Sequence, residues 1–376
     1  MAGKKFVFAS DSFKGTLSSQ DTARLLSEAA SEHFPGCECV SVPMADGGEG
    51  TTAAVVSACG GELRRVYVHD PLGRAIQAEL GLLPDGRAIV ETAAASGLPL
   101  LDAGERDPRR TSTYGTGELI RVALDAGARE VSVALGGSAT NDGGMGAMRA
   151  LGARFLDAGG DEFEGTGADL ARVCKIDLSG LDDRLAQTTF VAMCDVDNPL
   201  LGEMGATMVF GPQKGADVAA CAELEAGMRN YARVLADALG FDTTTPGAGA
   251  AGGLGAACQA FLGARMKSGV EQVMALVGLR EALVGASVCV TGEGHADAQT
   301  ARGKVVSGVA AACADAGVPC VAIVGGMDAG AATLRGVTAM VPTQIDAMPL
   351  DEILSRAEEL YALAARRVFS LLAVRI

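Results

Sequence analysis

The sequence predicts an α/β fold of two domains, on the strength of three observations. Short apolar strands alternate with helical periodicity near both ends of the chain, which is typical of a doubly wound parallel sheet. Hairpin turn signals, Asp70-Pro-Leu-Gly73 and Pro84-Asp-Gly86, indicate antiparallel strands in the middle. The length of 376 residues is enough for two or three domains. We therefore expect one doubly wound domain built from residues 1–62 and 285–376, and an inserted α/β domain with a mixed sheet over residues 63–284.

Two strand–loop–helix units open the chain. Ser18 and Asp21 form a capping-box pattern at the start of the first helix. Each strand is followed by a loop that carries a carboxylate, Asp11 in the first loop and Asp46 in the second. Ligands of open α/β sheets bind outside the carboxyl ends of the strands, so both loops are candidate site segments. The strands are expected over residues 6–9 and 39–42, and the helices over residues 18–34 and 51–59.

A phosphate site is indicated between Val131 and Gly146. A buried strand is expected over 131–135, a sharp turn at Gly136-Gly137-Ser138, and a helix over 144–151. This arrangement brings free backbone N–H groups and a partial positive charge to one place, which suits an anion. A tight turn that merely needs small residues would show the same pattern, and that alternative stays open here.

The remaining elements follow the same logic of apolar runs and turn residues. The Gly-rich segment 246–255 has GxGxxG spacing, but no buried strand precedes it, so it predicts a flexible loop and disfavours a nicotinamide dehydrogenase. Further strands are expected over residues 64–69, 75–82, 87–92, 189–194, 287–291, 320–324 and 337–341. Further helices are expected over residues 115–126, 218–239, 256–262 and 305–316, and from residue 351 onward.

Composition and charge limit the possible partners and the location. A net charge of −15 argues against nucleic acid and against an anionic membrane as partners. Ten cysteines without a CxxC pair, and only three histidines, argue against structural zinc and a disulfide framework. The N-terminal residues lead directly into a strand, and no apolar run has membrane-spanning length, so we expect a cytoplasmic protein with reduced thiols.

The chemistry of these residues fits a kinase that acts on a small alcohol. Such an enzyme needs donors around the phosphates, a carboxylate-bound Mg²⁺ and a carboxylate near the attacking hydroxyl. A Walker A motif and the protein-kinase motifs are absent. Loops supply the cations Lys14, Lys214 and Lys304, and predicted strand ends supply the carboxylates Asp11, Asp46, Glu49, Asp195, Asp197, Glu293 and Asp297.

Several long motifs, in order along nearly the whole chain, resemble those of the bacterial glycerate kinase family. They are Asp11-Ser-Phe-Lys-Gly15, Ala45-Asp-Gly-Gly-Glu-Gly-Thr51, Gly136-Gly-Ser-Ala-Thr-Asn-Asp-Gly-Gly144, Asp195-Val-Asp-Asn-Pro-Leu200, Gly211-Pro-Gln-Lys-Gly215, Pro246-Gly-Ala-Gly-Ala-Ala-Gly-Gly253, and Thr291-Gly-Glu-Gly294 with Asp297. The chain departs from the family pattern at Ser10, His295-Ala296 and Val306, where the family usually has Pro, Arg-Ile and Pro.

The resemblance implies a flavodoxin-like domain built from both chain ends, with an inserted restriction-enzyme-like domain. It also implies phosphorylation of D-glycerate by ATP with Mg²⁺, giving 2-phosphoglycerate. Related enzymes make 3-phosphoglycerate, so that product, or a related small hydroxy acid as substrate, stays an alternative. A non-catalytic sugar-acid-binding protein is the second alternative. We expect no nucleic-acid or membrane partner, and a monomer or homodimer.

Roles in the site follow as a hypothesis. Asp195 is expected to accept the hydroxyl proton, with Lys14 and Asp11 also in the catalytic group. Ser12, Lys14, Gly47 and Gly48 are expected to bind glycerate, and Asp297 with Asp46 to hold Mg²⁺. The phosphates of ATP are expected to contact Gly136, Gly137, Ser138, Asn141, Lys214 and Glu293.

Overall fold

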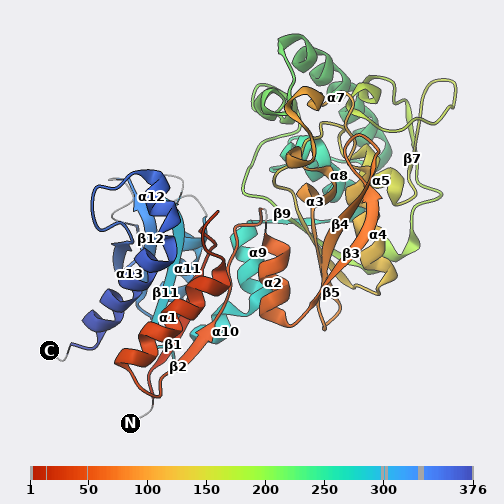
Figure 1. The fold of residues 1–376 in the computed structure, drawn as a ribbon. Coiled ribbons are helices and arrows are strands. Elements are labelled where there is room, and N and C mark those ends of the chain that lie inside the picture. The colour runs from red at the N-terminus through yellow and green to blue at the C-terminus, as the bar shows by residue number, and fades with distance from the viewer. Residues whose placement is uncertain are drawn as a thin grey trace. The chain divides into compact units, whose positions relative to one another are not determined.

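The computed structural model describes residues 3–13, 15–48, 50–297, 300, 304–328 and 334–374. The chain forms two compact units (Figure 1). The first unit contains Met1–Asp46, Ser57–Cys59 and Val270–Ile376, and the second contains Gly47–Val56 and Gly60–Gly269. The domain boundaries predicted at 62–63 and 284–285 stay a prediction, because compactness does not test which segments fold alone.

The first unit contains a five-stranded parallel sheet, and this confirms the doubly wound fold predicted for the chain ends. Its order is β13-β12-β11-β1-β2. The chain passes from β1 to β2 on one side and returns to β11 on the other, so the winding direction changes between β1 and β11. The strands are β1 (Lys5–Ser10), β2 (Glu38–Ser41), β11 (Val288–Ala296), β12 (Cys320–Met327) and β13 (Ala339–Pro342).

Helices cover both faces of this sheet. On one face α1 (Ser19–His33) lies over β1 and α13 (Ala357–Leu372) lies beside it over β12, with Phe6, Phe8 and Phe369 in their shared core (Figure 1). Alternation along β12 sends Ile323 to this core and Val324 to the opposite one, as expected of a strand that is buried on both faces. The other helices are α9 (Gly269–Val277), α10 (Leu279–Leu283), α11 (Val305–Ala316) and α12 (Leu350–Ser355).

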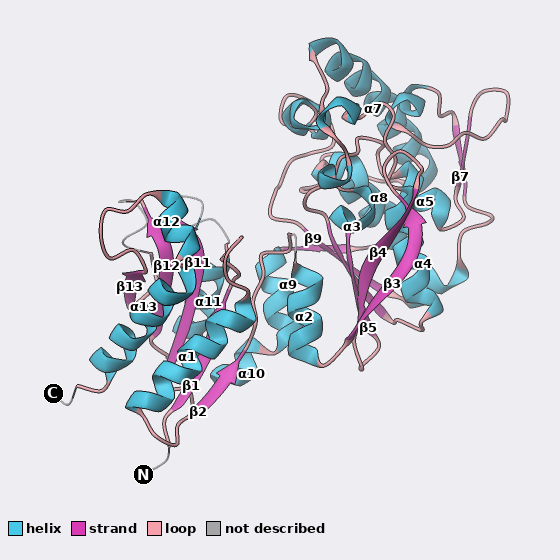
Figure 2. Cartoon of the chain, in the orientation of Figure 1, coloured by secondary structure: helices cyan, strands magenta, loops and turns pink. Residues whose placement is uncertain are grey.

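The second unit contains a six-stranded mixed sheet of order β10-β9-β6-β5-β4-β3 (Figure 2). The predicted antiparallel meander is confirmed, since β3 pairs with β4 and β4 with β5 in antiparallel fashion. The remaining pairs are parallel, so β5, β6, β9 and β10 all end at the same edge. The strands are β3 (Glu62–His69), β4 (Ala75–Leu82), β5 (Arg87–Glu91), β6 (Glu130–Ala134), β9 (Thr189–Met193) and β10 (Arg265–Lys267), with a separate pair β7 (Arg154–Leu156) and β8 (Lys175–Asp177).

Helices surround the core of this second sheet, in which Tyr231, Leu119 and Phe190 are buried. The α-helices are α2 (Thr51–Cys59), α3 (Thr92–Ser96), α4 (Tyr114–Asp125), α5 (Met145–Ala150), α6 (Ala206–Phe210), α7 (Val218–Leu239) and α8 (Leu254–Leu262). The 3₁₀ turns are η1 (Leu98–Leu100), η2 (Ala103–Glu105), η3 (Gly167–Ala171), η4 (Asp183–Gln187), η5 (Pro212–Lys214) and η6 (Ala250–Gly253).

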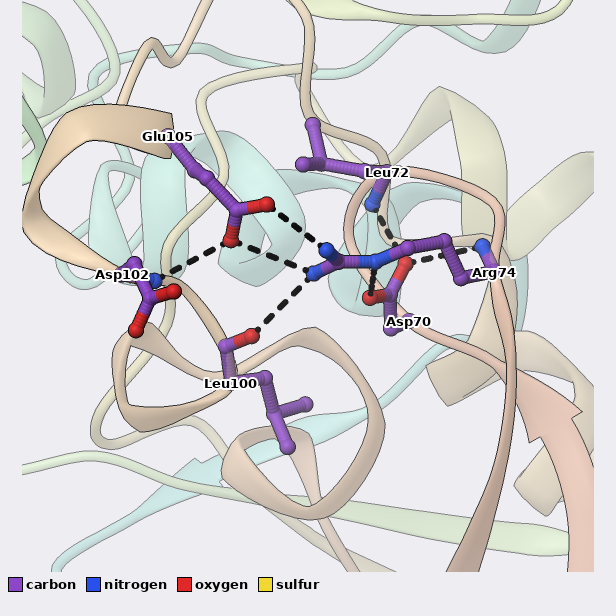
Figure 3. A network of polar contacts seen from close by, with 6 residues as sticks. All are labelled: Asp70, Leu72, Arg74, Leu100, Asp102 and Glu105. Carbon is purple, nitrogen blue, oxygen red and sulfur yellow. Dashed lines mark hydrogen bonds and ion pairs between the residues drawn. The ribbon is translucent and has the colours of Figure 1, made fainter.

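A polar network fixes the predicted turn between β3 and β4 (Figure 3). The buried carboxylate of Asp70 accepts from the backbone N–H of Leu72 at 2.8 Å and of Arg74 at 2.9 Å. The guanidinium of Arg74 also bonds Glu105 Oε1 at 2.7 Å and the carbonyl of Leu100 at 3.3 Å. The pKa of Glu105 is lowered, chiefly by this guanidinium. The hairpin turn is thereby tied to the segment that follows α3.

The structure contains elements that were not predicted, among them β7, β8, β10 and α9, and three predicted segments have a different structure. Strand β11 continues through 292–296, where a loop was expected, because its glycines allow close pairing with β12; a Cβ on Gly292 would lie 2.1 Å from the Ile323 carbonyl oxygen. The C-terminal helix is divided at Arg356 into α12 and α13. The segment 246–255 is largely buried and contains η6, so the expected flexible loop is wrong. No helix among the described residues is both long and apolar enough to cross a membrane.

Candidate functional site

The first unit has a cavity of about 640 Å³ at the carboxyl ends of its strands. Its polar side is formed by the residues that follow β1, by the end of β11 and by the start of α11. Parallel sheets bind ligands where the winding direction changes, and that point lies between β1 and β11. The charged or polar lining residues include Asp11, Ser12, Asp46, Glu293, His295 and Lys304, and Thr16, Thr343 and Gln344 line it as well.

The loop after β1 is fastened to β11 and turns Ser12 into the cavity lining. Asp11 donates its backbone N–H to the carbonyl of Gly292 at 2.9 Å. The Asp11 carboxylate accepts the N–H of Ser12 at 2.6 Å. Two of the predicted site residues therefore hold each other in place at the end of β1. Lys14, predicted for catalysis and glycerate binding, lies outside the described residues, as does Glu49.

Glu293 is the most unusual carboxyl group of this cavity. It is only 6% exposed, and among the described residues its Oε1 has no hydrogen-bond partner. Burial raises the pKa of Glu293, and the negative charges of Asp297 and Asp46 raise it as well. A hydrogen bond from Thr300 and the positive charge of Lys304 lower the pKa, so they reduce the upward shift. Four charged groups therefore act on one another at this end of the sheet.

Asp297 is held by the chain that follows it. Its Oδ1 accepts the N–H of Thr300 at 3.1 Å and lies 3.4 Å from the Nζ of Lys304. His295, which stands where the family usually has Arg, lies 3.2 Å from the Oδ1 of Asp328 and is exposed. The family's guanidinium is thus replaced by an imidazole that already has a carboxylate partner.

The carboxylates of this cavity fit Mg²⁺. Carboxylate oxygens are the protein ligands that Mg²⁺ prefers, and it usually takes only one or two of them, with water and phosphate oxygens completing its shell. Within the described ranges no group of three or more His, Cys, Asp and Glu side chains is placed to hold a metal ion by itself. Asp46 and Asp297, with the orphaned oxygen of Glu293, are a donor set that needs such additional ligands.

The second unit presents a loop at the end of β6, where phosphate contacts were predicted. Gly136 and Gly137 are exposed, and Gly137 has a φ of +74° that favours glycine. Leu98 donates to the carbonyl of Gly137 at 2.9 Å, and Ala139 donates to the carbonyl of Ser96 at 2.8 Å. In the part of the chain that is described, the N–H groups of Gly136 and Gly137 have no acceptor. These two backbone hydrogen bonds hold the loop in place, and the N–H groups of Gly136 and Gly137 remain available to an anion.

Lys214 lies directly beneath this loop. The side chain is 3% exposed, and its Nζ donates to Ser138 Oγ at 3.0 Å and to the carbonyl of Thr140 at 2.7 Å. Burial lowers the pKa of Lys214 to about 8, while the charge of Asp142 opposes the shift. The predicted phosphate-binding cation is therefore a buried amine that holds the loop through Ser138 and Thr140.

Asn141 and Asp142 are both fully buried and serve the structure around the loop. Asn141 Nδ2 donates to Thr207 Oγ1 at 3.0 Å. Asp142 accepts from the N–H and hydroxyl of Thr113, both at 2.7 Å, and from the N–H of Gly144 at 3.0 Å. Burial raises the pKa of Asp142 and these hydrogen bonds oppose the rise. The amide of Asn141 points to α6, so its predicted phosphate contact stays a prediction.

The Gly-rich segment 246–255 supports the same loop, a role that sequence reasoning missed. Gly252 accepts the N–H of Gly143 at 2.9 Å, and a Cβ on Gly252 would lie 2.0 Å from the carbonyl oxygen of Thr140. Ala251 has a φ of +51°, alone among the non-glycine residues that the structure describes. A strained residue held by its surroundings is characteristic of functional sites. The glycine spacing in 246–255 was the one feature of the sequence that could have indicated this supporting role.

Asp195 lies beside three predicted glycines at the same edge of the second sheet. Its carboxylate is exposed, and Oδ1 accepts the N–H of Gly269 at 3.0 Å. A Cβ on Gly47 would lie 2.7 Å from the Cα of Gly269, and one on Gly136 would lie 3.5 Å from the Cα of Gly48. The structure therefore brings the predicted base, the predicted glycerate-binding glycines and the phosphate loop together.

Comparison with known proteins gives one consistent result. The model of the glycerate kinase family matches residues 6–373. A curated relative from Escherichia coli K12, named glycerate 2-kinase, is 43% identical over 374 residues, with 98% of both chains covered. Glycerate kinase of Bacillus subtilis 168 is 42% identical over 368 residues, with 97% of this chain and 96% of the relative covered. A crystal structure from Salmonella typhimurium LT2, described as a glycerate kinase 2, superposes with a TM-score of 0.91 at 41% identity and 98% coverage of both chains.

Proposed function

The chain belongs to the glycerate kinase family, and on that premise we propose that it transfers the terminal phosphoryl group of ATP to the 2-hydroxyl of D-glycerate. The observation that carries the proposal is the family match from residue 6 to residue 373, with a relative named glycerate 2-kinase at 43% identity. The product is 2-phosphoglycerate. Transfer to the 3-hydroxyl is the alternative, since other relatives are named only glycerate kinase.

Asp195 is the proton acceptor in this proposal. Its carboxylate is exposed at the end of β9, and the N–H of Gly269 fixes one of its oxygens at 3.0 Å. A carboxylate held in this way orients the substrate hydroxyl and takes its proton as the bond to phosphorus forms. The expectation that Ser12, Lys14, Gly47 and Gly48 bind the carboxylate of glycerate stays a prediction.

The loop after β6 stabilises the transferred phosphoryl group. The N–H groups of Gly136 and Gly137 point out of a fixed turn, and the ammonium of Lys214 adds a positive charge beneath it. Preorganised donors of this kind act on the charge that develops on the phosphoryl oxygens. Asn141 contributes by holding the end of the loop against Thr207.

In this proposal Asp46 and Asp297 would hold Mg²⁺ directly or through water, and the buried carboxyl group of Glu293 would lie close to the cation. When bound, Mg²⁺ neutralises charge on the phosphates and orients them. Glu293 was predicted to contact phosphate, and a buried carboxyl group with an orphaned oxygen is better suited to a cation. Asp11 keeps Ser12 in position. The cytoplasmic location and the monomer or homodimer state stay predictions.

The test is release of ADP from ATP in the presence of Mg²⁺, with D-glycerate, with L-glycerate and with no acid. We expect release that depends on D-glycerate. ADP release that is independent of any acid would contradict the proposal. Binding of D-glycerate without turnover would favour the alternative of a non-catalytic sugar-acid-binding protein.

A further inference from the structure

The cavity of the first unit has an apolar side that the proposed chemistry does not use. Leu350, Ile353 and Leu354 recur at the spacing of one helical face on α12, and all three line the cavity. An apolar stripe of this kind normally packs against a core. Here no residue of α12 is buried, Leu350 is 68% exposed and Leu354 is 48% exposed. The helix lies beside β12 (Figure 1), and all three residues of the stripe belong to the cavity lining.

Two buried aromatic rings add to the apolar lining of the cavity. Phe13 and Tyr361 line the cavity, and their rings meet edge to face with centroids 5.2 Å apart. Both residues are buried, Phe13 after β1 and Tyr361 on α13. The carboxyl groups of Asp11, Asp46 and Glu293 line the same cavity. A ligand that fills this cavity needs an apolar part to contact α12 and the two rings, and a part that binds a divalent cation held by the carboxylates.

D-glycerate does not meet this description. It has three carbons, each of which carries oxygen, so it offers no apolar surface to α12. Cavities of about 300–1,000 Å³ suit ligands many times larger than such an acid, and this one measures about 640 Å³. Three carboxylates against Lys304 and His295 also disfavour an anion that arrives without a cation.

We infer that the face of α12 formed by Leu350, Ile353 and Leu354 binds the adenine ring of ATP, while the carboxylates of the same cavity receive the cation that accompanies its phosphates. The inference rests on the proposed function for the choice of ATP. A purine ring is flat and apolar on its faces, and its phosphates extend to the other end of the same molecule. The two-sided cavity matches this division.

Calorimetric titration of the full chain with ADP and Mg²⁺ tests the inference without turnover. We expect Leu350→Ala combined with Leu354→Ala to weaken ADP binding about tenfold, because the side chains that cover the ring are removed. Leu354→Glu should weaken it further, since the charge would lie against the ring. Leu371→Ala is the matched control: Leu371 is 72% exposed on α13 and lies outside the cavity lining, so binding should not change.

Steady-state kinetics separate the two ligands. The double variant should raise the KM for ATP about tenfold and leave the KM for D-glycerate within about twofold. Unchanged ADP affinity in both variants, or a rise in the KM for D-glycerate alone, would overturn the inference. A wild-type chain that binds ADP at this face without phosphorylating D-glycerate would refute the proposed function and leave the inference standing.

Discussion

Lys214 allows the sharpest prediction, because its charge and its contacts can be changed separately. The side chain is buried, its Nζ has two oxygen acceptors in Ser138 and Thr140, and burial lowers its pKa to about 8. The amine is therefore mostly an ammonium at pH 7 and mostly neutral at pH 9. A neutral amine still donates two hydrogen bonds, so the loop should persist while the positive charge is lost.

The loss of positive charge on Lys214 above pH 8 predicts how the activity changes with pH. If the charge of Lys214 stabilises the transferred phosphoryl group, kcat/KM for ATP should be level from pH 7 to about 8 and then fall about tenfold per pH unit. The Lys214→Met variant loses charge-assisted donors and leaves two buried oxygens unpaired, at roughly 1.5–3 kcal/mol each. Its kcat/KM at pH 7 should therefore be at least about a hundredfold lower, and its pH profile should lack the descending limb.

The pKa also predicts how folding stability depends on pH. The folded protein holds Lys214 with its pKa lowered from the ordinary 10.5 to about 8, so the unfolded chain binds more protons between these values. The contribution of this residue to the free energy of unfolding therefore rises as the pH increases from about 8 to 10.5. In Lys214→Met this contribution to the pH dependence should disappear.

The assay is a spectrophotometric measurement of ADP release from pH 6.5 to 9.5, on the wild type, Lys214→Met and a control, Lys175→Met. Lys175 is an exposed lysine of β8 in the same unit, so its variant should keep the wild-type profile. A wild-type kcat/KM that stays level through pH 9.5 would refute the role of the ammonium. So would a Lys214→Met variant with near-normal activity.

Three other predictions concern the loop support, the base and the metal. Gly252→Ala should lower the free energy of unfolding by about 3 kcal/mol in denaturant titrations, because its Cβ would lie 2.0 Å from the Thr140 carbonyl oxygen. Gly240 has the same φ of +66° but no atom near its Cβ position, so Gly240→Ala should cost only about 1 kcal/mol. Equal losses in the two variants would contradict the packing argument. Asp195→Asn should lower kcat at least roughly a hundredfold while the exposed neighbour variant Asp197→Asn stays within about threefold, and similar rates for both would remove Asp195 from its role. Asp297→Asn should raise the Mg²⁺ concentration for half-maximal activity about tenfold with little change in the KM for D-glycerate, and an unchanged Mg²⁺ titration would place the metal elsewhere.

Much of the fold could be predicted from local patterns. The capping box of Ser18 and Asp21 is present at α1, and helix α7 has the predicted bounds, because both depend on neighbouring residues. The parallel direction of the strands in the first sheet was predicted from the alternation of strands and helices at both chain ends. The meander of the second sheet followed from its two turn signals.

The structure of the glycine-rich segments was predicted poorly from the sequence. Gly292 and the glycines of 246–255 suggested loops, since glycine is rare in strands and frequent in turns. In the structure they serve close backbone packing, against β12 in one case and against Thr140 in the other. Such contacts join segments that are distant in the sequence, by more than a hundred residues for Gly252 and Thr140, so a local pattern cannot reveal them.

The site residues stay a prediction, and the structure shows only where the described ones lie. Asp11 and Asp195 lie just after β1 and β9, as expected from the apolar runs before them, whereas Glu293 lies within β11 and not in the loop expected there. Burial was not predictable: Lys214 was expected only as a cation in a loop, and the structure buries its side chain against Ser138 and Thr140. The apolar face of α12 was missed because helical spacing by itself indicates a core-facing helix.

Proton-coupled phosphorus NMR of the product formed from D-glycerate, ATP and Mg²⁺ tests the central claim most directly. Phosphorylation at the 2-hydroxyl places phosphorus next to a carbon with one proton, so the new resonance should be a doublet. A triplet would show transfer to the 3-hydroxyl, and the absence of any new phosphate ester would contradict the assignment of this chain as a kinase for D-glycerate.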